Sequence, residues 1–352
     1  MPDLPTARPR IAALPAYSRA AGAGSVRWRA SSNESTVPPS PAVVQAVARV
    51  GAQAHLYPTL AGDDLVEAIA TRLGTSPDQV VVGGGSLAVL QLALTAYTGP
   101  GTEVVHAWRS YEAYPILIGI ADAQPVPVPL DGEFRHDVEA MLAAVTERTS
   151  AVLVCDPNNP TGTTLPPQRL GELVAGVPSN VLVLLDQAYC EFDEQDPLDV
   201  AALVAEHPNV VVFRTFSKAY GLAGLRAGYA VGSAEVVAPV RNSAPPFGLS
   251  AAAEAAALAA WADAAHTAEI VATVTASREA FRGGLAERGL HTPDARGNFV
   301  WLPVGERATE LERLCVRHGV SVRAFAGEGV RVTVGDPDAE AAVLAAVEDL
   351  LG

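Results

Sequence analysis

Short apolar runs that stop abruptly at polar or glycine-rich segments constrain the fold of this chain more than any other feature. Val80–Val82, Ala151–Cys155, Val181–Leu185 and Val210–Phe213 consist almost entirely of Val, Leu and Ala, and their lengths are those of buried strands. Polar residues that directly follow such runs lie at strand ends. With 352 residues, the chain is long enough for two domains, or for one large α/β domain with a smaller companion.

The segment Thr215–Arg226 follows one of these runs and contains Lys218 among small and apolar neighbours. A lysine in such surroundings has a lowered pKa and can attack an aldehyde as a neutral amine. Ser217 and Arg226 carry suitable hydrogen-bond donors for a nearby phosphate. Taken alone, a lysine in a loop is more often a solvated surface residue, so the surrounding motifs must decide between the two interpretations.

Gly83–Ser86 forms a glycine-rich turn between an apolar run and the helix expected at Leu87–Tyr97. Backbone amides and the positive end of a helix dipole make such a junction a natural phosphate site. Dinucleotide-binding folds have a similar turn, but this one is not GxGxxG and no acidic residue follows at the required position. The turn therefore predicts a phosphate site without identifying the ligand.

Composition argues against several classes of function. The formal net charge of −15 disfavours nucleic acid as a partner, and no apolar run approaches the length of a membrane span. The N-terminus lacks the pattern of a signal peptide, and the histidines are too scattered to predict a metal site. Three cysteines without a CxxC pair favour a reducing compartment, which we expect to be the cytoplasm.

The Thr215–Arg226 segment closely resembles the lysine-attachment motif of fold type I pyridoxal-phosphate (PLP) aminotransferases. The resemblance extends from about Tyr17 to Val334, and it is greatest for the histidinol-phosphate aminotransferase family and its aromatic (phenylalanine) branch. It implies an α/β fold, with a large domain built on a mainly parallel sheet flanked by helices and a smaller α/β domain. We expect an N-terminal arm over residues 1–40 that contributes to the small domain, a large PLP-binding domain over 41–247, and a small C-terminal domain over 248–352.

The same resemblance assigns the residues that would hold and activate PLP. Lys218 would bind the cofactor as a Schiff base and later move a proton, with Asp186 and Tyr189 completing the catalytic set. Asp186 would pair with the protonated pyridine nitrogen, since a carboxylate at the end of an apolar strand is costly unless it is paired. The implied cofactor-binding residues also include Gly85, Ser86, Ser217 and Arg226 at the phosphate, Tyr111 stacked on the ring, Asn159 and Tyr189 at the phenolic oxygen, and Tyr57 from the neighbouring subunit of a homodimer.

The resemblance assigns substrate-binding residues as well. Arg331 and Asn33 would lie near the substrate α-carboxylate, a task that suits a bidentate guanidinium, and Tyr17 would close over the substrate. Trp108-Arg109 resembles the aromatic branch, whose amino donor needs an apolar slot; the candidates for its lining are Tyr17, Trp108, Tyr111 and Phe247. Histidinol phosphate would instead need cations at its phosphate, and the candidates are Arg323 with Arg19, Arg27 or Arg29.

The resemblance therefore predicts an aminotransferase that moves an amino group between an aromatic amino acid, such as phenylalanine, and a 2-oxo acid by a ping-pong mechanism. Histidinol-phosphate aminotransferase is the main alternative, and a related PLP-dependent decarboxylase or a PLP-binding regulator without turnover are further ones. Two residues depart from the family pattern: Asp156 stands in place of an asparagine and Gln187 in place of a glutamate. Nothing in the sequence explains Asp156, and little cost is expected from Gln187.

Overall fold

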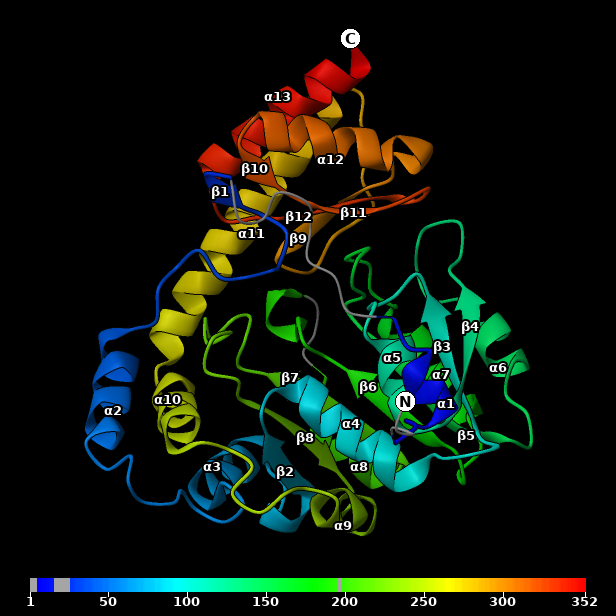
Figure 1. Ribbon diagram of the computed structural model, residues 1–352, viewed down its shortest axis with the longest axis vertical. Helices are drawn as coiled ribbons and strands as arrows, with labels where there is room; N and C mark the ends of the chain where they lie inside the picture. The colour runs from blue at the N-terminus through cyan, green and yellow to red at the C-terminus, as the bar shows by residue number, and fades with distance from the viewer. Residues whose placement is uncertain (1–4, 16–25, 195–197) are drawn as a thin grey trace.

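A seven-stranded sheet forms the centre of the larger part of the molecule, in a computed structural model that describes residues 5–15, 26–194 and 198–352 (Figure 1). Neighbouring strands are parallel except at β8, which runs antiparallel to both β7 and β2. This arrangement confirms the expected mainly parallel sheet. From one edge to the other, the strands are β2 (Val80–Gly83), β8 (Gly228–Gly232), β7 (Val210–Thr215), β6 (Leu182–Asp186), β5 (Thr149–Cys155), β3 (Glu103–Trp108) and β4 (Gln124–Pro129).

The strands of this sheet are buried on both faces, as their continuous apolar sequences predict. In β6, Leu182 and Leu184 join one hydrophobic cluster, whereas Val183 joins the other, because successive side chains of a strand point to opposite faces. Helices contribute to the cluster on each side. One face packs against α4 (Ser86–Tyr97), α5 (Tyr114–Ile120) and α9 (Ala234–Asn242), and the other against α3 (Asp63–Leu73), α6 (Val138–Ala143), α7 (Pro167–Gly176) and α8 (Val200–Glu206).

The smaller part of the molecule combines an N-terminal strand with the C-terminal portion of the chain (Figure 1). β1 (Trp28–Arg29) pairs in parallel with β10 (Val320–Ser321). Helix α10 (Ala251–Ala262) lies after the predicted boundary at residue 247, yet it packs on α2 (Pro41–Gly51) and α3, which lie before that boundary. The boundaries at residues 40 and 247 therefore stay a prediction. A second, antiparallel sheet consists of β11 (Arg323–Phe325), β12 (Gly329–Thr333) and β9 (Phe299–Leu302). The other long helices of the C-terminal portion are α11 (Ala264–Glu287), α12 (Ala308–Arg317) and α13 (Pro337–Leu351).

Side-chain caps fix the starts of helices α2 and α10. Ser40 accepts a hydrogen bond from the Val43 amide at the start of α2, and Ser250 accepts one from the Ala253 amide (3.1 Å) at the start of α10. The short helix α1 (Pro9–Ala12) lies beside α5, where Arg8 donates to the Ile120 oxygen (3.1 Å).

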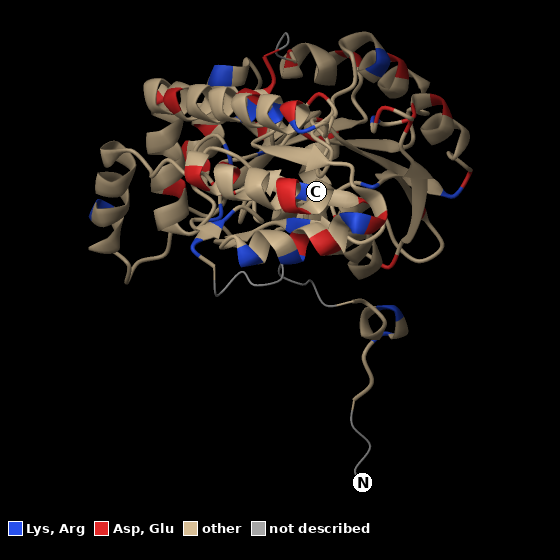
Figure 2. Cartoon of the chain, turned by 90° about the horizontal axis from the view of Figure 1, so that it is seen from above, with Lys and Arg blue, Asp and Glu red and all other residues tan. Residues whose placement is uncertain are grey.

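The helices carry mixed charges. Acidic and basic residues are interspersed along the helices on the face seen in Figure 2. Within residues 5–15, 26–194 and 198–352, no helix is both long enough and apolar enough to cross a membrane.

Candidate active site

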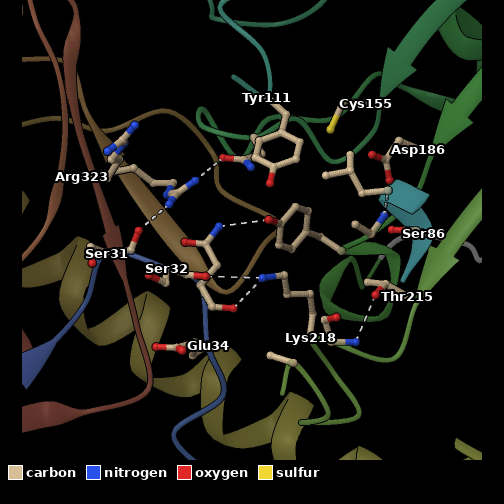
Figure 3. A pocket seen from close by; sticks show the side chains of 18 of the residues that line it. Ser31, Ser32, Glu34, Ser86, Tyr111, Cys155, Asp186, Thr215, Lys218 and Arg323 are labelled. Carbon is tan, nitrogen blue, oxygen red and sulfur yellow. Dashed lines mark hydrogen bonds between the residues drawn. The ribbon is translucent and has the colours of Figure 1, made fainter. Parts of the chain in front are cut away.

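A cavity of about 640 Å³ lies at the carboxyl ends of the parallel strands and faces the smaller part of the molecule (Figure 3). Parallel strands end at the same edge of a sheet, so polar side chains that follow different strands meet there. The loops after β3, β5, β6 and β7 form one wall, and residues 31–34 with β11 and β12 form the other. The cavity therefore joins the two parts of the molecule, and the predicted residues that line it are Arg29, Asn33, Ser86, Tyr111, Asn159, Asp186, Tyr189, Ser217, Lys218, Arg226, Arg323 and Arg331.

Lys218 is the only lysine in the chain, and it lies inside this cavity. Its Nζ donates hydrogen bonds to the backbone oxygens of Asn33 (2.9 Å) and Ser32 (3.5 Å), drawn in Figure 3. Loss of hydration and the nearby charge of Arg331 lower the pKa of Lys218 from 10.5 to about 7. Much of the amine is therefore neutral near pH 7, which is the form that attacks an aldehyde.

Asp186 ends β6 and is 6% exposed. One carboxylate oxygen accepts a hydrogen bond from the Tyr114 hydroxyl (2.7 Å), and the other accepts one from the Ala188 amide (3.2 Å). Burial raises the pKa of Asp186 to about 6. A carboxylate in so dry a place is stabilised by a cationic partner, which a protonated pyridine nitrogen would provide.

Asn33 connects the N-terminal segment to the wall of the cavity that carries Tyr189 and Lys218. Its side-chain amide donates to the Tyr189 hydroxyl (3.0 Å), and its backbone amide donates to Thr333 Oγ1 (2.9 Å). Its backbone oxygen accepts from both Lys218 and Asn298. Burial raises the pKa of Tyr189, so the hydroxyl keeps a proton to donate, as the predicted contact with a phenolic oxygen requires.

Donors for a phosphate converge where α4 begins. Ser86, Ser217 and Arg226 line the cavity there, and Arg226 Nη1 donates to the Ser217 hydroxyl (3.1 Å). Gly85 has a φ of 96°, and a Cβ added to it would lie 2.6 Å from Arg226 Nη2. A Cβ on Gly228 of β8 would lie 2.1 Å from the Ser86 backbone nitrogen. Gly85 thus lets the guanidinium approach the N-terminus of α4, and Gly228 lets β8 approach it. The first approach brings together two groups that suit an anion.

Arg331 reaches the cavity from β12 and is 7% exposed. Its two terminal nitrogens donate to Asn159 Oδ1 and to the Ser31 backbone oxygen, both at 2.6 Å. A buried guanidinium of this kind suits a carboxylate ligand. The contact also orients Asn159, whose amide NH₂ group would serve the predicted phenolic oxygen, and both roles stay predictions.

The arginines considered for a substrate phosphate are paired with carboxylates or lie away from the cavity. Arg323 donates from Nε and Nη2 to the two oxygens of Glu112, at 3.0 and 2.7 Å. Arg29 donates to both oxygens of Glu34 at 2.6 Å. Arg27 is not among the described residues that line the cavity, and Arg19 lies outside the described residues.

Only one of the aromatic residues expected in an apolar slot is seen to line the described cavity. Tyr111 lines it and meets the Tyr114 ring edge-on at 5.6 Å. Trp108 packs instead against the Arg109 guanidinium, 4.1 Å from its ring centre. Phe247 stacks at 4.7 Å on Tyr57, which is 83% exposed, so neither ring reaches this cavity. Tyr17 lies outside the described residues.

The two departures from the family pattern have structural roles. Asp156 is 7% exposed and accepts a hydrogen bond from the Leu165 amide (2.9 Å), which holds the loop after β5. Burial raises the pKa of Asp156 to about 7. Gln187 Oε1 accepts two hydrogen bonds from Arg214, at 3.1 and 2.8 Å, so a neutral side chain anchors this arginine.

Sequence reasoning missed Tyr114, Thr333 and Glu112, which contact the predicted residues. Thr333 lies two residues after Arg331 on β12, so the period of a strand places both on one face. Tyr114 begins α5 in the same loop as Tyr111. Glu112 has no such signal, because its partner Arg323 is 211 residues away in the chain.

The residues around the cavity fit PLP. An anion site at α4 suits its phosphate, the buried carboxylate of Asp186 suits its ring nitrogen, and the amine of Lys218 suits its aldehyde. The three groups line one cavity and come from different strand ends, so a single ligand can contact all of them.

Comparisons with known proteins agree with this geometry. The family model "Aminotransferase class I and II" matches residues 30–347. The chain is 47% identical to an aromatic amino acid aminotransferase of Thermobifida fusca, over 88% of this chain and 86% of that protein. It is 44% identical to one of Streptomyces avermitilis, over 95% and 94%. Histidinol-phosphate aminotransferase from Sinorhizobium meliloti, solved in complex with pyridoxal-5'-phosphate, superposes with a TM-score of 0.89 at 29% identity, over 99% of this chain and 98% of that one.

Proposed function

The chain belongs to the class I and II aminotransferases, and from this premise we propose that it uses PLP to exchange amino groups between aromatic amino acids and 2-oxo acids. The observation that carries the proposal is the single lysine of the chain, which has a lowered pKa and shares one cavity with Asp186, Tyr189 and a phosphate cradle. Relatives 40–47% identical over most of the chain are named aromatic amino acid aminotransferases.

When bound, PLP would supply an aldehyde that takes up the amino group and a ring that withdraws electrons from the substrate Cα. Lys218 would hold the cofactor covalently, while Ser86, Ser217 and Arg226 hold its phosphate. Asp186 would keep a proton on the ring nitrogen, and its buried hydrogen bond with Tyr114 keeps the carboxylate oriented for this task.

The side chains of the protein account for substrate positioning and proton transfer. Arg331 would bind the α-carboxylate in a dry site, which fixes the orientation of Cα. Lys218 Nζ, about half of which is neutral near pH 7 and which is backed by the Asn33 backbone oxygen, would take the proton from Cα and deliver it to the aldehyde carbon of the cofactor. Tyr189 would donate its hydroxyl proton to the phenolic oxygen.

A neutral aromatic substrate agrees with the charges around the cavity. The guanidinium of Arg323 is occupied by Glu112, and that of Arg29 by Glu34. A substrate phosphate would have to compete with these carboxylates. Histidinol-phosphate transamination is the second candidate, because the overall structure superposes closely on an enzyme with that name.

The proposal includes a homodimer. Tyr57 is 83% exposed and stacks on Phe247, and its chain neighbours Leu56 (60%) and Leu60 (59%) are exposed too. Clustered apolar side chains on a soluble surface favour a partner, and a second copy would bring Tyr57 to the neighbouring cofactor phosphate. The thiols of Cys155, Cys190 and Cys315 are free, which agrees with a reducing compartment such as the cytoplasm.

The unique lysine allows a direct test of cofactor attachment. The protein is incubated with PLP, reduced with borohydride, denatured and digested with a protease that cleaves only after lysine. We expect the reduced holoprotein to resist cleavage, whereas untreated protein yields residues 1–218 and 219–352. Protein that binds PLP and is still cut after reduction would contradict the role of Lys218.

The substrate is tested in the same preparation with one amino donor at a time and no acceptor. Phenylalanine should convert bound PLP to pyridoxamine phosphate faster than histidinol phosphate does, as followed by absorbance. The opposite order would establish the second candidate instead. Release of carbon dioxide without a keto acid would indicate a decarboxylase.

A further inference from the structure

We propose that Glu112 determines which substrate side chains the cavity accepts, an inference that rests on the proposed transamination. By occupying Arg323, Glu112 cancels a positive charge beside the substrate carboxylate site. The cavity then disfavours donors whose side chains carry a carboxylate or phosphate and accepts those whose side chains are neutral.

The register of the small sheet places two arginines side by side. Arg323 of β11 and Arg331 of β12 are directly paired residues, and both line the cavity. Directly opposite residues of an antiparallel pair project from the same face of the sheet, and like charges at such positions repel one another. In Figure 3, Arg323 lies across the pocket from Asp186 and Ser86. It therefore faces the substrate end rather than the phosphate end of the cofactor.

Glu112 meets Arg323 in the geometry of a strong ion pair. Two parallel hydrogen bonds of 3.0 and 2.7 Å join the guanidinium to the carboxylate, and the side chains are only 12% and 23% exposed. Bidentate and partly buried pairs are stronger than exposed ones. An anionic substrate group would have to displace Glu112 from Arg323 or lie close to its negative charge, whereas a neutral ring meets neither cost.

Position in the chain links this selectivity to the cofactor site. Glu112 follows Tyr111, which lines the cavity, and precedes Tyr114, which donates to Asp186. One short segment after β3 thus carries three residues with different tasks: Tyr111 is the predicted stacking ring, Glu112 neutralises Arg323, and Tyr114 orients the Asp186 carboxylate. A substitution of Glu112 alone would change the charge beside Arg323 and leave Tyr111 and Tyr114 unchanged.

The chain offers a matched control for this ion pair. Glu328 pairs with Arg109 through Nε (2.8 Å) and a second, shorter contact, with side chains that are 19% exposed for Arg109 and 36% for Glu328. Neither residue is among the described residues that line the cavity. Glu328→Gln therefore removes a comparable carboxylate from an arginine without changing the charge of the substrate site.

The experiment uses two probes of nearly equal size, 4-carboxyphenylalanine and the neutral 4-carbamoylphenylalanine. The ratio of their second-order rate constants in the half-reaction isolates the effect of side-chain charge. Glu112→Gln should raise the carboxy-to-carbamoyl ratio about tenfold or more, mainly through tighter apparent binding of the anionic probe. Glu328→Gln should leave the ratio within about twofold. The gain in Glu112→Gln should shrink at high salt, because screening weakens the new attraction.

A double variant separates charge selection from a purely structural role of Glu112. Glu112→Gln combined with Arg323→Gln removes both charges of the ion pair, so the anionic probe should gain nothing. An unchanged ratio in Glu112→Gln protein that retains PLP and the wild-type melting temperature would overturn the proposal, as would an equal gain in the double variant. Failure of the wild-type protein to react with any amino donor would overturn the proposed function instead.

Discussion

At the scale of single residues, burial changes the charge of groups that the proposed chemistry uses. Lys218 has a lowered pKa, and Asp186 has a raised one. In both cases removal from water disfavours the charged form. Before the cofactor binds, these side chains therefore reduce the stability of the fold. As a result, the free energy of unfolding should depend measurably on pH.

The loss of stability caused by burying Lys218 should be seen when cofactor-free wild-type protein is compared with the Lys218→Met variant. The folded-state pKa of about 7 lies below the unfolded value of 10.5, so the unfolded state binds more protons between these pH values. Wild-type stability should consequently rise with pH over this range, relative to Lys218→Met, by about 3 kcal/mol between pH 7 and 9.5. Urea unfolding of both proteins measures the difference, and parallel pH profiles would contradict it.

Asp156 gives a prediction of opposite sign. Its folded-state pKa of about 7 lies above the ordinary value of 3.8, so the folded state binds more protons and loses stability as the pH rises through 7. Asp156→Asn keeps an acceptor for the Leu165 amide and removes the buried charge. The variant should gain about 2 kcal/mol relative to wild type between pH 5 and pH 8. Thermal or urea unfolding at the two pH values tests this, and equal differences at both would refute the assignment.

At the scale of secondary-structure elements, the site depends on how closely β8 approaches the start of α4. Gly228 lies opposite Gly83 in the β2–β8 pair, and its α-carbon faces the backbone of Gly85 and Ser86. A side chain there would collide with backbone atoms, which cannot rotate away. The contact thus couples β8 to the predicted phosphate site.

Gly228→Ala should therefore weaken PLP binding by tenfold or more and destabilise the fold by about 2 kcal/mol or more. Gly171→Ala is the matched control, because Gly171 lies inside α7 with no atom near its missing side chain. It should stabilise the protein by about 0.5–1 kcal/mol, as alanine favours a helix. PLP titration and urea unfolding measure both effects, and equal behaviour of the two variants would exclude the proposed contact.

The sequence could predict those site residues that directly follow a strand, but not those that depend on how distant elements pack together. Asn159, Asp186 and Lys218 could be predicted because each follows a buried strand, and parallel strands gather such residues at one edge. The Glu112–Arg323 pair could not, because it depends on how the smaller sheet sits against the loop after β3. No local pattern encodes that placement. The same dependence on packing explains why Trp108 and Phe247, which the sequence offers as candidates for an apolar substrate slot, do not line the cavity.

At the scale of the whole molecule, one edge exposes apolar side chains that a single chain does not cover. The apolar edge, as we call it, consists of Leu56, Tyr57, Leu60 and Phe247. Phe247 and Leu60 are joined by a backbone hydrogen bond of 3.0 Å, and the rings of Phe247 and Tyr57 stack. These contacts hold the edge in shape although it lies on the surface, which favours a preformed interface over a mobile loop.

Leu60→Glu should therefore convert the proposed dimer to a monomer in light scattering, because it places a charge in the apolar edge. Transamination should fall with it, since each cavity would lose Tyr57 of the partner chain. Leu351→Glu is the control, as Leu351 is 50% exposed on α13 and not part of the apolar edge. A Leu60→Glu protein that remains dimeric would place the interface elsewhere, and a monomeric protein with full activity would show that one chain completes the site.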